Sequence, residues 1–505
     1  MIRRFRLLAV TGLWAVAVVV SSLAAESAGE DVRPLAVKIF ATQRFPDVFR
    51  PWTQLEAQSI SGSGVIIEGK RILTNAHVVR NASELYVQPY QSADKLEAHV
   101  VGFAPGIDLA VIELDDPSFF DTRGHVTIAT EIPKVKDQIS VYGYPMGGDE
   151  LSVTEGIVSR IEFTSYYGET NGLRLQVDAA LNPGNSGGPA FADGKLAGLV
   201  FSGIPSSQNI GYLIPAEEIQ LFLDDIADGA YDGKPMINDG LQTMENPAIR
   251  EKLKLPKDKG GFMIIDPYDD EGGKYPLRRW DVLTQIGDYP LDSQGNVKIG
   301  DNLRVDAKYL LQRLAKDGHV PCRIWRDGAE VSVSVPIRYK LDKVIPMLGN
   351  DRPRYFIYGP LVFSIATEEM VAVVGNNARG GVPHPTGPLF GRLGDRPAFP
   401  GEEIVIVCSR PFPNPIMKGY DAPFLYVLDE VNGVKVKNLR HLVEMLRDMK
   451  EQFVSFKFSG EGPMTPEIPV FEHKKMLAAT EAVINDNGIR SPYSDDIAKI
   501  WNAKP

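Results

Sequence analysis

Residues 35 to about 228 form a succession of short apolar runs separated by turns rich in Gly, Pro and Asn. The stretch GSGVIIEGKRILTN, for example, holds two apolar runs on either side of Gly69 and Lys70. Short runs of this kind, bounded by turn residues and repeated at close intervals, predict the β-strands of a sandwich or a barrel. We therefore expect a mainly β fold for this part of the chain.

A glycine-rich turn near the end of this region is the first feature that indicates a catalytic function. The stretch QVDAALNPGNSGGPA, residues 176–190, places Ser186 between neighbours with almost no side-chain bulk. Glycines allow backbone angles that other residues avoid, and such a turn can aim the N–H groups of Gly184 and Ser186 at one point, where an oxyanion could bind. The pattern predicts a nucleophilic serine, although a turn of this composition also occurs without any function.

A nucleophilic serine needs a base, usually a histidine, and an acid that orients the base. The seven histidines are His77, His99, His125, His319, His384, His441 and His473. We select His77 because it directly follows a strand pattern in TNAHVV, whereas the other six lie in polar or loop-like surroundings. For the acid we select Asp108, which directly precedes the apolar run LAVIEL. An aspartate before a strand is more often a plain turn residue, but here three elements agree.

The three blocks TNAHVV, DLAVIEL and GNSGGP follow one another in the order His, Asp, Ser, and in this they resemble the Deg/HtrA family of chymotrypsin-fold serine proteases. The resemblance extends from about residue 35 to about residue 470 and is looser beyond the protease part. The length and the two C-terminal modules are similar to the plant-type branch of the family.

This resemblance implies a chymotrypsin-like double β-barrel protease domain over residues 35–228. The first barrel would carry His77 and Asp108, and the second would carry Ser186. His77 would take the Ser186 proton, Asp108 would hold the imidazole, and the amides of Gly184 and Ser186 would stabilise the oxyanion.

By the same resemblance, Ala180 and Leu181 belong to the specificity pocket. A trypsin-like pocket carries an acid six positions before the serine, where this chain has Ala180. We expect an apolar pocket of modest size and cleavage after small or medium aliphatic residues. Loops at residues 164–172 and 202–210 correspond to regulatory loops of the family, and the alternative is that they are simply mobile loops.

Two further modules follow the predicted protease domain. Residues 236–340 look like a PDZ domain, with a carboxylate-binding loop formed by Gly260, Gly261, Phe262 and Met263. Small residues let backbone amides face the terminal carboxylate of a peptide, and the following strand would offer an open edge for β-augmentation. The alternative is an ordinary glycine turn that leads into a strand.

Residues 341–474 form a more divergent PDZ-like module. Its candidate loop is YGPLVF, in which Pro360 lacks an amide donor, so an interface or spacing role competes with carboxylate capture. The stretch PFLYVLDEVNGVKVKNLRHLVEMLRD supplies a strand, a turn and a helix in PDZ order, and residues 375–401 predict a long Gly- and Pro-rich loop. Residues 475–505 are a C-terminal tail with a short helical pattern and no assigned function.

Residues 1–25 have a basic start, an apolar run and a small-residue end, which together predict a secretory signal peptide. The apolar run is too short for a comfortable transmembrane helix. We therefore expect export, to the periplasm in a bacterium, and no stable membrane insertion after cleavage. The alternatives are an uncleaved N-terminal anchor and an organellar transit peptide.

Composition excludes several other classes of protein. A chain of 505 residues predicts about three domains, and a net charge of −11 argues against nonspecific binding of nucleic acid. Cys322 and Cys408 fall in different modules, so a disulfide is not favoured.

GVIIEGK resembles a phosphate-binding loop, but Arg71 replaces its Ser/Thr and the stretch predicts two strands. No residue cluster has the spacing of a metal site, so we expect no cofactor.

The sequence thus predicts an ATP-independent serine endopeptidase of protein quality control that cleaves unfolded or misfolded polypeptides. C-terminal peptides would bind its first PDZ module, and by resemblance it would assemble as a trimer or hexamer. Two alternatives are a holdase chaperone or PDZ scaffold with a dormant protease domain, and a processing protease with one native substrate.

Overall fold

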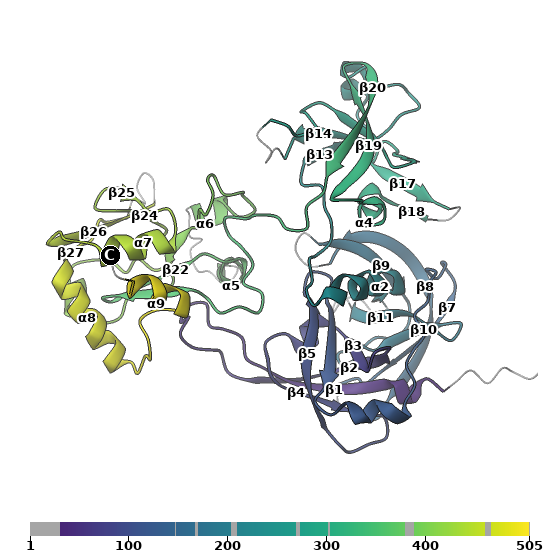
Figure 1. Cartoon of the computed structure of the whole chain (residues 1–505), viewed down its shortest axis with the longest axis horizontal. Coiled ribbons are helices and arrows are strands. Elements are labelled where there is room, and N and C mark those ends of the chain that lie inside the picture. Colours follow the sequence, from purple (N-terminus) through teal and green to yellow (C-terminus); the bar gives the residue numbers. More distant parts are fainter. Residues whose placement is uncertain are drawn as a thin grey trace, which may run out of the picture.

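A computed structural model describes residues 31–146, 148–166, 170–203, 210–268, 273–300, 303–378, 388–459 and 466–503. Within these ranges the chain forms two closed β-barrels and then two smaller modules of sheets and helices (Figure 1). The mainly β double barrel expected from the sequence is confirmed. The predicted signal peptide lies outside the described residues. In the described part, no helix has both the length and the apolarity needed to cross a bilayer.

The first barrel closes in the strand order β1-β2-β3-β6-β5-β4. Its strands are β1 (Ala36–Gln43), β2 (Gln58–Ile67), β3 (Arg71–Thr74), β4 (Ala82–Gln88), β5 (Leu96–Ala104) and β6 (Leu109–Leu114). Short helical turns accompany them: η1 (Arg33–Leu35), α1 (Ala76–Val79) and η2 (Pro117–Thr122). Gly69 and Lys70 both have positive φ, which makes the tight turn between β2 and β3. The apolar residues of the strands, such as Ile39 and Ile72, are fully buried inside the barrel.

The second barrel closes in the order β10-β11-β12-β9-β8-β7. Its strands are β7 (Gln138–Gly143), β8 (Ser152–Ser165), β9 (Asn171–Val177), β10 (Pro189–Ala192), β11 (Lys195–Gly203) and β12 (Gly211–Pro215). Helix α2 (Ala216–Asp225) and η3 (Ile226–Asp228) follow. One apolar cluster contains residues of both barrels, including Leu109 and Leu199, so the barrels pack directly against each other.

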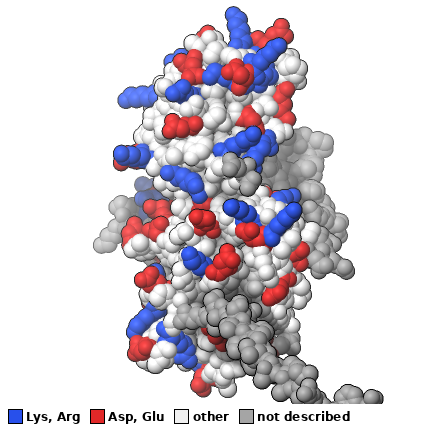
Figure 2. Space-filling view, turned by 90° about the vertical axis from the view of Figure 1, so that its right-hand side faces the viewer, with Lys and Arg blue, Asp and Glu red and all other residues white. Residues whose placement is uncertain are grey.

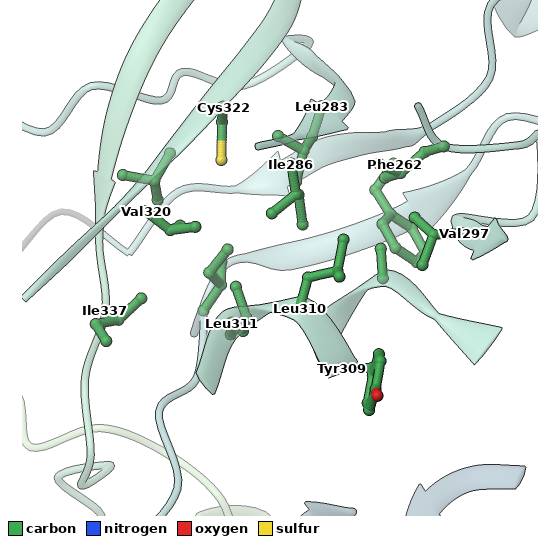
Figure 3. Packing of buried hydrophobic residues seen from close by; sticks show 14 of the residues in the cluster. Phe262, Leu283, Ile286, Val297, Tyr309, Leu310, Leu311, Val320, Cys322 and Ile337 are labelled. Atoms are coloured by element: carbon green, nitrogen blue, oxygen red, sulfur yellow. The ribbon is translucent and has the colours of Figure 1, made fainter. Parts of the chain in front are cut away.

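The middle module, residues 236–340, is built on a sheet with the main order β13-β14-β15-β19-β20. Its elements are β13 (Gly240–Thr243), α3 (Pro247–Lys252), β14 (Phe262–Asp266), β15 (Val282–Ile286), β16 (Tyr289–Pro290), β17 (Asn296–Ile299), β18 (Leu303–Asp306), η4 (Ala307–Leu310), α4 (Leu311–Leu314), β19 (His319–Arg326) and β20 (Ala329–Pro336). Figure 3 shows Leu310 and Leu311 pointing from the helical turn toward the sheet that carries Ile286 and Cys322. These contacts close the core of the module.

The C-terminal module comprises residues 341–503. Its strands are β21 (Tyr355–Tyr358), β22 (Leu361–Ile365), β23 (Val405–Val407), β24 (Leu428–Val431), β25 (Val434–Lys435), β26 (Phe453–Phe458) and β27 (Val470–Glu472). Its helices are α5 (Glu368–Ala378), α6 (Pro388–Gly391), η5 (Pro415–Met417), α7 (Leu439–Arg447), α8 (His473–Asp486) and α9 (Asp495–Trp501).

The predicted C-terminal tail is part of this module's core. Met476 and Ile497 are fully buried in the cluster that also holds the apolar face of α7. The ring of Trp501 lies 5.1 Å from that of Phe356 in β21. Residues from 475 to about 501 therefore fold with the module, because their apolar side chains cover β21 and α7.

Two sets of contacts connect the modules to the barrels. The middle module rests on the second barrel, where the ring of Tyr309 lies 6.0 Å from that of Phe163 and the module's core continues into Leu173 of β9. The loop between β1 and β2, residues 44–57, reaches the C-terminal module, where Trp52 packs on Phe412 at a ring distance of 5.7 Å. The first barrel is thus in contact with the C-terminal module (Figure 1).

Figure 2 shows one face of the molecule, on which acidic and basic side chains are interspersed without a large area of one sign. This face does not provide the basic stripe on which nonspecific binding of nucleic acid depends.

Candidate active site

His77 lies on the short helix α1, directly after β3. The chain around His77 is held from two sides. The buried side chain of Asn75 donates to Asp108 O at 3.0 Å, and the side-chain amide of Gln43 donates to His77 O at 2.7 Å. The position of the imidazole is therefore fixed by β1, by β3 and by the turn before β6.

Asp108 lies in that turn with a φ of 57° and is 1% exposed. Its Oδ1 accepts the backbone N–H of His77 at 2.8 Å, and its Oδ2 lies 2.7 Å from His77 Nδ1. Burial raises the pKa of the Asp108 carboxyl, and the hydrogen bonds and charge of His77 oppose that rise. With the carboxylate as acceptor, Nδ1 carries the proton and Nε2 is left to accept one, which is the tautomer that a general base needs.

Ser186 lies in the turn between β9 and β10 and is half-buried. Its carbonyl accepts the N–H of Ser63 at 2.8 Å, which joins the second barrel to β2 of the first. Gly184 and Gly187 on either side have φ values of 98° and 83°, which only glycine adopts without strain. The hydrogen bonds of the described residues do not include one between Ser186 Oγ and His77. In serine hydrolases without substrate this contact is often long.

The backbone N–H groups of the turn differ in whether they already have a hydrogen-bond acceptor. Asn185 N–H donates to Asn182 O at 3.0 Å and Gly187 N–H donates to Val200 O at 2.9 Å. Within the described part of the chain, neither Gly184 N–H nor Ser186 N–H has an acceptor. The two amides chosen from the sequence are therefore the two that remain available for an oxyanion.

Ser63 is a residue of this site that sequence reasoning missed. It is fully buried, its hydroxyl donates to Gly184 O at 2.8 Å, and the same oxygen accepts Tyr144 N–H at 2.9 Å. A signal was present, since Ser63 stands between two glycines directly before the apolar end of its strand. Glycine in a strand often marks a close approach of another part of the chain, and here a Cβ on Gly62 would lie 2.8 Å from Val78.

The predicted pocket residues lie just before the serine turn. Ala180 is exposed, and Leu181 is half-buried against the core of the second barrel and against Gly211. A Cβ on Gly211 would lie 2.2 Å from Leu181 Cδ1, so the glycine makes room for this side chain. The two loops named as regulatory reach beyond the described residues, at 167–169 and 204–209.

The predicted carboxylate-binding loop of the middle module is not open to a peptide. Gly261 N–H already donates to Asp292 O at 2.8 Å, and a Cβ on Gly260 would lie 2.1 Å from the backbone of Asp292. Phe262 and Met263 are buried, and their strand β14 is paired with β13 on one side and with β15 on the other. The prediction of an open edge after this loop was wrong, because the glycines serve close packing of two segments. Among the described strands, β13 is the one at that edge of the sheet.

In the C-terminal module the candidate loop around Pro360 is the turn of the β21-β22 hairpin. Strand β22 pairs with β21 on one side and with β23 on the other. A peptide could not add to β22 unless β21 left it, so the hairpin fills the edge that β-augmentation would use.

Comparison with known proteins agrees with this arrangement. Residues 62–199 match the trypsin-like peptidase domain family, and residues 344–496 match the PDZ domain family. The match to the PDZ family falls on the module that appeared the more divergent in sequence.

Curated relatives extend over most of the chain. Protease Do-like 4, mitochondrial, of Arabidopsis thaliana is 34% identical over 91% of this chain and 85% of its own length. Protease Do-like 2, chloroplastic, of the same plant is 31% identical over 91% of this chain and 75% of its own length. Among solved structures, "HtrA-type protease AlgW with decapeptide" superposes with a TM-score of 0.47 at 22% identity, over 61% of this chain and 97% of that one.

These matches and the double barrel define the class of the protein, which is a trypsin-like serine endopeptidase with a PDZ domain. Because the relatives at 34% and 31% identity are Do-like proteases matched over most of their length, the chain belongs to the Deg/HtrA family of serine proteases.

Proposed function

We propose that Ser186, His77 and Asp108 are the catalytic triad of this endopeptidase. The observation that carries the proposal is the His77–Asp108 pair, in which a buried carboxylate holds Nδ1 at 2.7 Å and leaves Nε2 for the serine proton. Ser186 attacks the peptide carbonyl, His77 accepts the hydroxyl proton and passes it to the leaving amine, and the Gly184 and Ser186 amides bind the oxyanion. Water then hydrolyses the acyl-enzyme by the same route.

We further propose that the enzyme cleaves unfolded or damaged proteins after small or medium aliphatic residues and needs no ATP. Ala180 supports this proposal, because no acid stands at the position where a trypsin-like pocket would bind Lys or Arg. Quality control of unfolded chains fits such a preference, since aliphatic residues become accessible when a protein unfolds.

The test is digestion of an unfolded model protein by the full chain and by Ser186→Ala, with the cleavage sites mapped by mass spectrometry. Cuts after Val, Ala or Ile that vanish in the variant would support both proposals. Cuts at one site of one native protein would support the processing protease, and an uncut substrate that stays soluble only with the protein present would support the dormant chaperone.

Peptide binding and assembly are separate proposals. The edge strand β13 supports binding of an extended peptide segment at the middle module, since its outer edge is unpaired among the described strands. We keep assembly as a trimer or hexamer as a proposal from the family, to be tested by sedimentation of the full chain.

Localisation is likewise a proposal. The names of these relatives include the words "mitochondrial" or "chloroplastic". They support the organellar alternative for residues 1–25 and give no support to a periplasmic location. Cell fractionation of the full chain with a C-terminal tag would separate the two.

A further inference from the structure

Lys38 is a buried cation for which the proposed mechanism gives no role. It lies in β1 of the first barrel, and its side chain is 7% exposed. Burying an ammonium group is costly unless it is paired and hydrogen-bonded. The hydrogen-bond partners of Lys38 therefore indicate which segment of the chain it positions. Its Nζ donates to Gly148 O at 3.0 Å and to Asp149 Oδ1 at 2.9 Å. Both partners lie in the second barrel, on the loop that follows β7.

This loop lies against the oxyanion turn. Met146 N–H donates to Pro183 O at 2.7 Å. The peptide bonds are all trans in the part of the chain that the structure describes, so the carbonyl of Pro183 and the N–H of Gly184 point in opposite directions. While Met146 holds the carbonyl, Gly184 N–H is directed to the other side, toward the proposed oxyanion. A Cβ on Gly184 would lie 2.5 Å from Tyr144 O, so the loop and the turn are in direct contact.

Lys38 holds this loop together with a neighbour on the same barrel. Lys38 and Ser63 are direct cross-strand partners in the pairing of β1 with β2, and paired residues of this kind project from the same face of a sheet. Ser63 accepts Tyr144 N–H at the start of the loop, and Lys38 binds Gly148 O near its end. The first barrel therefore holds the loop at both ends, with Met146 between them.

We propose that Lys38 is a positioning residue for the oxyanion hole: through Gly148 and Asp149 it helps to fix the segment of residues 144–146, whose Met146 N–H in turn fixes the peptide plane that presents Gly184 N–H. This inference rests on the proposed catalytic mechanism. Lys38 touches neither substrate nor the reacting atoms. Its effect is to set the direction of one amide donor, and an oxyanion donor typically contributes about 10²–10³ in rate.

The test compares Lys38→Met with Lys95→Met in the full chain. Lys95 is an exposed lysine that lies over the same ring of Phe40 as Lys38, and it makes no hydrogen bond to the loop among the described residues. Lys95→Met therefore removes a charge nearby without removing the tether. We expect Lys38→Met to lower kcat about 10- to 100-fold with KM changed less than about threefold, since part of one oxyanion donor's effect is lost. Lys95→Met should stay within about twofold, and Lys38→Arg, which keeps a cation that can donate to the loop, should be more active than Lys38→Met.

A peptide boronate supplies a readout that a purely structural role would not change. Its tetrahedral adduct with Ser186 places an oxygen in the oxyanion hole, so its Ki should rise in Lys38→Met in parallel with the loss of kcat. Substrate KM, which reports ground-state contacts, should not follow. An unchanged Ki and kcat in a folded Lys38→Met would overturn the inference.

A second pair of variants applies if Lys38→Met does not fold. Asp149 is 93% exposed, and Asp149→Lys replaces the anion that pairs with Lys38 by a cation without disturbing a core. Glu150→Lys makes the same charge change one residue further on, at an exposed side chain. We expect Asp149→Lys to lower kcat about three- to tenfold more than Glu150→Lys, as a weakened tether costs less than a lost donor. Equal activities of the two would overturn the inference.

Labelling of Ser186 by a fluorophosphonate separates this inference from the proposed function. If the wild-type chain is labelled and Ser186→Ala is not, the triad is supported whatever Lys38 does. If the wild-type chain is neither labelled nor active, the catalytic proposal fails, and the inference about Lys38, which depends on it, fails as well. If the wild-type chain is active and Lys38→Met equals Lys95→Met, only the role of Lys38 fails.

Discussion

Replacement of Gly187 by alanine tests the contact between the serine turn and the first barrel. Gly187 has a φ of 83°, and a Cβ there would lie 2.1 Å from Ser63 O and 2.4 Å from Thr74 Oγ. Gly194 provides the matched control, because its φ is 73° and a Cβ there meets nothing within 4 Å. Both substitutions force alanine into the left-handed region, at about 1–2 kcal/mol each. Their difference therefore measures the contact alone.

The magnitude follows from what the new methyl group must displace. Carbon and oxygen atoms do not approach closer than about 3.3 Å without repulsion, so Ser63 O must move by more than about 1 Å. That movement breaks the 2.7 Å hydrogen bond from Thr74 Oγ and strains the one from Ser63 N–H to Ser186 O. Each buried hydrogen bond lost costs about 1–3 kcal/mol. We expect Gly187→Ala to lose about 2–5 kcal/mol, and Gly194→Ala to lose only the backbone contribution of about 1–2 kcal/mol.

Activity should separate the two variants further. A displacement of about 1 Å in a catalytic group can reduce the rate about 10²-fold, so Gly187→Ala should lose at least that much in kcat/KM while Gly194→Ala keeps nearly all of it. The assays are peptide hydrolysis and urea unfolding followed by probes in the barrels, because several modules need not unfold in one step. Equal losses of stability and activity in the two variants would refute the reasoning.

Three other variants test further contacts of the site and of the modules. Asp108→Asn should reduce kcat about 10⁴-fold by favouring the wrong tautomer of His77, measured as peptide hydrolysis. Since burial raises the pKa of Asp108, the folded state holds this proton more tightly than the unfolded state, and the contribution of Asp108 to stability falls as the pH rises above 3.8. The melting temperature of Asp108→Asn relative to wild type should therefore be higher at pH 7 than at pH 4, because the contributions of the other carboxyls are shared by both proteins. Trp52→Ala should weaken docking of the C-terminal module by about 2 kcal/mol, seen as faster limited proteolysis between the modules, whereas Leu55→Ala, at a side chain 44% exposed, should not. Ser63→Ala leaves two buried backbone groups without a partner and should lower stability by about 2–4 kcal/mol, measured by urea unfolding.

The sequence identified the parts of the site that are encoded in short motifs. Ser186 among glycines, His77 after a strand and Asp108 before one can each be found locally, and the structure brings His77 and Asp108 to 2.7 Å. The roles of Lys38 and Ser63 could not be found in this way, although the glycines beside Ser63 indicate a close approach of another segment. Each is a polar residue inside a strand, and its partners are more than 80 residues away in the other barrel, so only the pairing of the strands and the packing of the barrels define its role.

The errors have a related physical origin. A glycine in the sequence indicates that another segment packs closely against the backbone, but it does not identify that segment. At Gly260 and Gly261 the approaching segments are those of Asp292 and Leu283, so a glycine turn that looked like a peptide site is a packing contact. The predicted tail had the same difficulty, because Met476 and Ile497 have apolar side chains whose burial depends on a strand more than 100 residues earlier.

Strand β1 connects the elements of the site with the C-terminal module. Lys38 near its start holds the loop beside the oxyanion turn, and Gln43 at its end holds the carbonyl of His77. The chain then continues into the loop that carries Trp52 to the C-terminal module. On the other side of His77, Arg80 lies 3.3 Å from Glu369 of that module. A displacement of the C-terminal module must therefore either break the contacts of Trp52 and Arg80 or pull on the segments that hold the base. The first event would free the module and the second would disturb the His77–Asp108 pair, so the position of the module and the geometry of the base are not independent.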